Sequence, residues 1–232
     1  MTLPGWQWNE MQQVGTDYND LAEVEAYDKR MATFRNVDEE NRQILETMKL
    51  PAGSAVLEIG CGTGRFVRAA AAAGFRASAV DVSALMLEYV EKMAVADGVS
   101  EIVLEHAGFL TMDFPDERFD VVVSGAALHH LPDAWKYVAL RNIVRVLKPE
   151  GQLLLRDVVF APAAGEPPEV CFERFCSAIP KMREEAARHV ATEYSTYDWI
   201  MEGMLTRSGF DILSVVSPAE WFRIYHCRKQ NR

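Results

Sequence analysis

The sequence predicts an α/β fold, in which helices cover both faces of a mostly parallel sheet. Short, largely apolar runs, typical of strands buried on both faces of such a sheet, alternate along the chain with helical patterns. These runs are Val56–Ile59, Ala77–Val80, Ile102–Leu104, Phe119–Ser124 and Gln152–Val159. The first run also leads through a glycine-rich loop directly into a helix, which is the unit from which nucleotide-binding sheets are built.

The loop after the first strand is the organising feature of the chain. Gly60, Gly62 and Gly64 allow positive φ and close backbone approach at little cost. The helix that follows, residues 65–73, is rich in alanine and ends before Gly74. Strand, loop and helix N-terminus together present free backbone N–H groups to a nucleotide-sized ligand. The segment therefore predicts a cofactor site.

The side chains around this loop indicate which cofactor it binds. The dinucleotide pattern G-x-G-x-x-G needs a third glycine where this chain has Arg65 or Val67, so neither register fits. Glu58 precedes the loop, and its carboxylate would repel a pyrophosphate but suits the sulfonium and ammonium of S-adenosylmethionine. Asp81 follows the second strand, where an acid accepts hydrogen bonds from ribose hydroxyls. We therefore expect S-adenosylmethionine rather than NAD.

Four sequence segments carry a family resemblance. They are VLEIGCGTG at residues 56–64, AVDVS at 79–83, FDVVVSGAALHHL at 119–131 and LKPEG at 147–151. In order and spacing they resemble the class I S-adenosylmethionine-dependent methyltransferases, over about residue 38 to the C-terminus. The resemblance implies a Rossmann-like, mostly parallel seven-stranded sheet with an antiparallel C-terminal hairpin. It also implies an enzyme that transfers the methyl group of S-adenosylmethionine.

The resemblance and the loop together define a set of expected cofactor residues. In many relatives an aspartate after the third strand accepts from the adenine amino group, but this chain has Gly108 there. We expect backbone groups of Gly108 and Phe109 to bind adenine instead, with the Phe109 ring as a stacking face. Met86 either presses on the adenine or belongs to the core. The expected cofactor residues are Glu58, Gly60, Cys61, Gly62, Gly64, Asp81, Val82, Met86, Gly108, Phe109 and Ser124.

The catalytic candidates are two histidines and a tyrosine. An oxygen, thiol or ammonium acceptor must lose a proton, and histidine is the natural base near neutral pH. His129 is the first candidate, because relatives with a histidine after an apolar leucine in this loop can use it, and His130 is the second. A purely structural loop histidine is the alternative. Tyr18 is a further candidate, and the sequence does not separate it from Tyr27.

Two segments are expected to frame the site. Residues 1–37 form a predicted N-terminal lid, and residues 38–232 form the methyltransferase domain. A proline- and glycine-rich break at residues 161–168 introduces a predicted helical cap at about residues 162–194. The alternative for both segments is that they merely pack on the core.

Composition limits the partners. The formal charge of −10 argues against a phosphate-backbone partner, and the early chain lacks the pattern of a signal peptide. Cys171 and Cys176 do not have the spacing of a zinc knuckle, so no metal site is expected. We expect a cytoplasmic monomer or homodimer that methylates a small molecule, with no nucleic acid or membrane partner. A methyltransferase acting on protein or RNA, and a non-catalytic S-adenosylmethionine-binding protein, are the alternatives.

Overall fold

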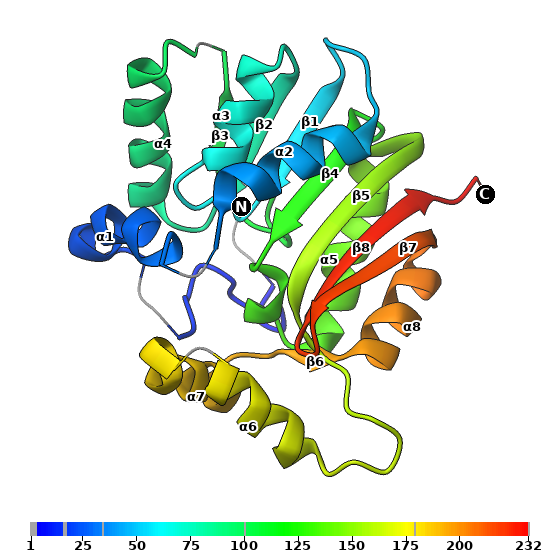
Figure 1. Cartoon of the computed structure of the whole chain (residues 1–232). Helices are drawn as coiled ribbons and strands as arrows, with labels where there is room; N and C mark the ends of the chain where they lie inside the picture. The colour runs from blue at the N-terminus through cyan, green and yellow to red at the C-terminus, as the bar shows by residue number, and fades with distance from the viewer. Residues whose placement is uncertain (1–3, 16–17, 34, 100, 179, 232) are drawn as a thin grey trace.

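A single twisted sheet forms the centre of the protein (Figure 1). The computed structural model describes residues 4–15, 18–33, 35–99, 101–178 and 180–231. The strand order is β3-β2-β1-β4-β5-β8-β7, in which the first five strands are parallel and β8 and β7 are antiparallel. The strands are β1 (Ala55–Ile59), β2 (Arg76–Asp81), β3 (Val103–His106), β4 (Phe119–Gly125), β5 (Leu147–Phe160), β7 (Phe210–Ala219) and β8 (Phe222–Lys229). This arrangement confirms the predicted Rossmann-like fold and its C-terminal hairpin.

Helices cover both faces of the sheet. They are α1 (Leu21–Met31), α2 (Val37–Met48), α3 (Arg65–Ala72), α4 (Ala84–Ala96), α5 (Asp133–Val146), α6 (Pro168–Ala178), α7 (Arg183–Thr192) and α8 (Asp198–Ser208). All five residues of β1 are buried, and they alternate between two cores. Leu57 and Ile59 share a core with α5 and α8, whereas Val56 packs with α2 and α3 on the other face. This two-sided burial is why every residue of the strand except Glu58 is apolar.

Two local details were not part of the sequence expectations. Asn36 caps α2, and its side chain accepts from the backbone N–H of Glu39 at 3.1 Å. A two-residue strand, β6 (Thr196–Tyr197), pairs in parallel with the end of β5 and was not expected. Ser83 caps α4 as its sequence position indicates.

The carboxyl ends of the parallel strands meet at one edge of the sheet, and three other segments gather there. The N-terminal segment, α1 and the α6–α7 pair all lie at this edge (Figure 1). Of the predicted lid and cap, residues 1–3, 16, 17, 34 and 179 lie outside the described residues. No helix in the described part of the chain is long and apolar enough to cross a membrane. The edge where these segments meet is where a ligand of an open α/β sheet binds.

Candidate functional site

A cavity opens at the carboxyl ends of β1, β2 and β4. Its walls come from the ends of these strands, from the loop after β3 and from the N-terminal segment. Nine of the fourteen predicted site residues line it: Tyr18, Gly60, Gly62, Asp81, Val82, Met86, Gly108, Phe109 and His130. The cavity therefore brings together the glycine loop, the expected ribose acid and one of the two loop histidines.

The glycine loop is held close to the loop after β4. A Cβ on Gly60, which has φ 71°, would lie 2.4 Å from Cβ of Ala127. Any side chain at position 60 would therefore collide with Ala127 unless the two loops moved apart. Gly62 also has positive φ, and its N–H donates to Oδ2 of Asp81 at 2.8 Å. These contacts fix the position of the loop before any ligand arrives.

Asp81 is presented to the cavity by backbone hydrogen bonds. Its Oδ1 accepts from the N–H of Ser83 at 2.9 Å, and its Oδ2 accepts from Gly62. Burial raises the pKa of Asp81 above its usual value, and the backbone hydrogen bonds offset only part of this rise. Each carboxylate oxygen has two lone pairs, so the fixed side chain keeps capacity for hydroxyl donors.

Four of the expected cofactor residues contact other parts of the protein instead of lining the cavity. Glu58 accepts from the N–H of Val67 in α3 at 3.0 Å, and burial raises the pKa of its carboxyl to about 8. Ser124 donates through Oγ to the carbonyl of Ile59 at 2.9 Å. The other two pack against apolar side chains: Cys61 in the core between α3 and α4, and Gly64 against Val90.

The first catalytic candidate, His129, also lies outside the cavity wall. It belongs to the 3₁₀ helix η1 (Leu128–His130), and its Nδ1 is hydrogen-bonded to Asp157. Its Nε2 lies 3.2 Å from Oε2 of Glu193. Burial alone would lower the pKa of His129, but the charges and hydrogen bonds of these two carboxylates raise it to about 9. Since both ring nitrogens are engaged, this environment disfavours His129 as a proton acceptor.

His130, the second candidate, faces the cavity. Burial, and then the adjacent charge of His129, lower the pKa of His130 to about 3, so its imidazole is neutral at physiological pH. Its Nδ1 is buried and has no hydrogen-bond partner among the described residues. The two histidines thus have opposite environments although they are adjacent in sequence.

The N-terminal segment forms one wall of the cavity. Tyr18 and Tyr27 both line it, and their rings meet edge to face with centroids 5.9 Å apart. The carbonyl of Tyr18 accepts from Oγ of Ser83 at 2.6 Å, which ties the segment to the end of β2. Thr63 of the glycine loop donates to Oδ1 of Asp28 in α1 at 2.7 Å. The segment is therefore fastened on both sides of the site.

Sequence reasoning missed Glu10, which lies beside Gly108. Its Oε1 accepts from the N–H of Leu110 and from Oγ1 of Thr111, both at 2.8 Å. A Cβ on Gly108 would lie 2.5 Å from both Cδ and Oε2 of Glu10, so this carboxyl fills the space of a side chain at position 108. Glu10 is buried at the cavity wall, and this burial raises the pKa of its carboxyl.

The backbone groups expected to bind adenine already have partners. The N–H of Gly108 donates to Oγ1 of Thr111 at 3.0 Å, and the carbonyl of Phe109 accepts from Asn142 at 2.9 Å. The one sequence signal for an unusual contact here was the glycine at position 108, where many relatives have an aspartate. Sequence alone gave no means of finding which distant segment supplies a replacement.

Comparisons with known proteins identify the family. The family described as methyltransferase domain matches residues 56–151. An uncharacterized methyltransferase of Bacillus licheniformis is 31% identical over 185 residues, which are 77% of this chain and 78% of that protein. The chain belongs to the class I S-adenosylmethionine-dependent methyltransferases. The predictions of family, enzyme class and cofactor are therefore confirmed.

Two other similar proteins are a solved structure with the same fold and a relative that this methyltransferase matches over only part of its length. The crystal structure of an S-adenosylmethionine-dependent methyltransferase from Aquifex aeolicus superimposes with a TM-score of 0.65 at 18% identity, covering 90% of this chain and 98% of that one. The 27-O-demethylrifamycin SV methyltransferase of Amycolatopsis mediterranei is 36% identical over 118 residues. That match covers 50% of this chain and 43% of the relative, so the chain spans less than half of that enzyme's length.

Proposed function

We propose that this methyltransferase transfers the methyl group of S-adenosylmethionine to a small molecule that binds beside His130. The observation that carries the proposal is that the N-terminal segment forms a wall of the cavity, with Tyr18 and Tyr27 on its inner surface. A cavity closed in this way suits a small acceptor better than an extended polymer. Residues 1–37 then act as a lid, and the helical insertion at about residues 162–194 acts as a cap on the acceptor side.

The cofactor position follows from the polar groups on the wall. Asp81 accepts from the two ribose hydroxyls, as acids at this strand end do in related sheets. The adenine then lies between Met86 and Phe109, next to Gly108. Oε1 of Glu10 is bonded to protein donors, and Oε2, which lies against Gly108, is the proposed acceptor for the adenine amino group. Glu10, which comes from the N-terminal segment, thus supplies the acceptor for the adenine amino group that an aspartate at position 108 supplies in many relatives.

For methyl transfer the protein has to position the two reactants and accept the proton of the methyl acceptor. Methyl transfer from a sulfonium is an in-line displacement that releases a neutral thioether, so no departing anion needs stabilising. Holding the acceptor in line and excluding water provide most of the acceleration. His130 faces the cavity whereas His129 does not, so His130 replaces His129 as the proposed acceptor of the proton.

A labelled-cofactor screen tests this function. The relative named for a 27-O-demethylated substrate suggests hydroxyl-bearing aromatic and macrocyclic compounds as the first members of the panel. Alcohols, amines and thiols of similar size complete it, and bulk protein and RNA are tested in parallel. We expect label in a small molecule, with loss of transfer in His130→Ala. Label only in the protein or RNA fraction, or in no fraction while cofactor binds normally, would contradict the proposal.

A further inference from the structure

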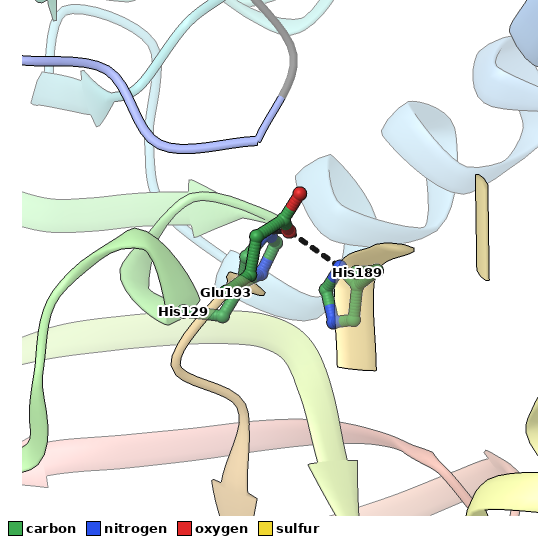
Figure 2. Close-up of side chains that lie close together, drawn as sticks. All are labelled: His129, His189 and Glu193. Atoms are coloured by element: carbon green, nitrogen blue, oxygen red, sulfur yellow. Dashed lines mark ion pairs between the residues drawn. The ribbon is translucent and has the colours of Figure 1, made fainter. Parts of the chain in front are cut away.

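Three potential metal ligands converge behind the acceptor side of the cavity. His129 comes from η1, and His189 and Glu193 come from the end of α7 (Figure 2). One ligand atom from each lies within 4.8 Å of the other two. Oε2 of Glu193 is 3.2 Å from Nε2 of His129 and is also bonded to Nδ1 of His189. His189 and Glu193 are four residues apart, which places them on one face of the helix end.

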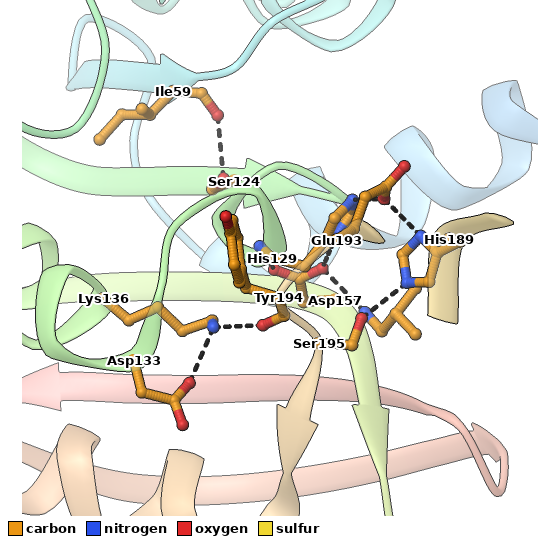
Figure 3. Close-up of polar contacts among 11 residues, drawn as sticks. Ile59, Ser124, His129, Asp133, Lys136, Asp157, His189, Glu193, Tyr194 and Ser195 are labelled. Atoms are coloured by element: carbon orange, nitrogen blue, oxygen red, sulfur yellow. Dashed lines mark hydrogen bonds and ion pairs between the residues drawn. The ribbon is translucent and has the colours of Figure 1, made fainter. Parts of the chain in front are cut away.

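The remaining nitrogen of each histidine is held by an outer partner. Nδ1 of His129 is bonded to the carboxylate of Asp157, and Nε2 of His189 lies 2.6 Å from Oγ of Ser195 (Figure 3). An acceptor at one ring nitrogen fixes the proton there and turns the lone pair of the other nitrogen inward. In metal centres the ligating histidines are almost always oriented by such outer hydrogen bonds.

We propose that His129, His189 and Glu193 bind a divalent transition-metal ion, with Asp157 and Ser195 orienting the two histidines. Two imidazoles and one carboxylate form a donor set that suits Zn²⁺ and Fe²⁺. No cysteine is part of the cluster.

The charge of the cluster favours a divalent cation. Glu193 and Asp157 are two carboxylates whose side chains are only 9% and 1% exposed. Buried negative charge is costly unless it is paired. A divalent ion at the three ligand atoms would balance both of these charges.

The metal centre would join three parts of the chain. Glu193 also touches the N-terminal segment: a Cβ on Gly15, which has φ 83°, would lie 2.2 Å from Oε1 of Glu193. The ion would therefore fasten the end of α7 to the loop after β4, directly beneath the proposed lid. This inference goes beyond the proposed function, because none of the three ligands lines the cofactor cavity.

Metal analysis of the full-length protein tests the site. The purified protein is stripped with a chelator, and Zn²⁺, Mn²⁺ and anaerobic Fe²⁺ are titrated against a competing chromophoric chelator. We expect one equivalent of at least one of these ions to bind tightly. Glu193→Gln keeps the size of the side chain but removes its charge, and it should abolish tight binding, as should His189→Ala. Loss of an outer partner in Ser195→Ala should weaken binding by about 10- to 100-fold.

Two controls make the outcome decisive. His226 is bonded to Gln152 in the hairpin region, and His226→Ala should leave the stoichiometry unchanged. Binding of S-adenosylhomocysteine by each variant reports whether the cofactor site is intact, independently of the metal. Failure of all three ions to bind the wild-type protein would show that the cluster is a proton-sharing network only. Wild-type metal affinity in both Glu193→Gln and His189→Ala would place the ion elsewhere. Either result would overturn the proposal.

Discussion

Glu10→Gln is the substitution that probes the proposed adenine contact most sharply. In the wild-type protein Oε1 of Glu10 accepts from Leu110 and Thr111, and Oε2 is the atom that we propose accepts from the adenine amino group. A glutamine keeps its amide oxygen on those two protein donors, because its NH₂ group cannot accept from them. The NH₂ group then replaces Oε2, so a donor faces the donor on adenine.

The expected loss is that of a hydrogen bond to a charged group, about 1.5–3 kcal/mol. This corresponds to a roughly 10- to 150-fold rise in the Kd of S-adenosylhomocysteine. The inosine analogue carries a carbonyl oxygen in place of the amino group, so the new NH₂ group suits it. Glu10→Gln should therefore reverse the preference between the adenosyl and inosyl compounds.

Isothermal titration calorimetry with both compounds measures this change. A double variant, Glu10→Ala with Gly108→Asp, provides the matched rescue, because the new aspartate occupies the space that Glu10 vacates. We expect it to bind adenosyl compound more tightly than Glu10→Ala alone. Unchanged affinity and unchanged preference in Glu10→Gln would refute the assignment of Glu10 to adenine.

Three further outcomes follow from the same geometry. Asp81→Ala should weaken cofactor binding by about 1.5–3 kcal/mol in calorimetry, and equal affinity would remove Asp81 from the ribose. His130→Ala should lower turnover by about 10²-fold or more at unchanged S-adenosylhomocysteine affinity, whereas a wild-type rate would return the role to His129, Tyr18 or no side chain. The pKa of Glu58 is about 8 in the folded protein and raised from 4.5, so its contribution to stability is fully present below the lower value and is lost as pH rises from there through about 8. Denaturant titrations should show this decline in the wild-type protein and a flatter profile in Glu58→Gln; identical profiles would contradict the burial argument.

The parts of the site that could be predicted are those set by local sequence. Gly60, Gly62 and Asp81 were found because a strand, a tight loop and the next strand end at one edge of a parallel sheet. Strand spacing also placed Gly108 at the cavity, at the position where many relatives have an aspartate.

The rest could not be predicted because it depends on contacts between distant segments. Glu10 reaches Gly108 only when the N-terminal segment folds across the sheet edge, and no spacing rule links the two. His129 was predicted to be the base from its place in the loop after the fourth strand, yet Asp157 and Glu193 contact its two ring nitrogens in the folded chain. The three residues of the proposed metal site could not be brought together from sequence for the same reason, because they lie on η1 and at the end of α7.

A crystal structure of the protein with S-adenosylhomocysteine tests the proposed cofactor site most directly. We expect the ribose hydroxyls on Asp81, the adenine amino group within hydrogen-bond distance of Glu10, and the sulfur directed toward His130. An adenine bound away from Gly108, with Glu10 still hydrogen-bonded only to protein, would contradict the proposed site.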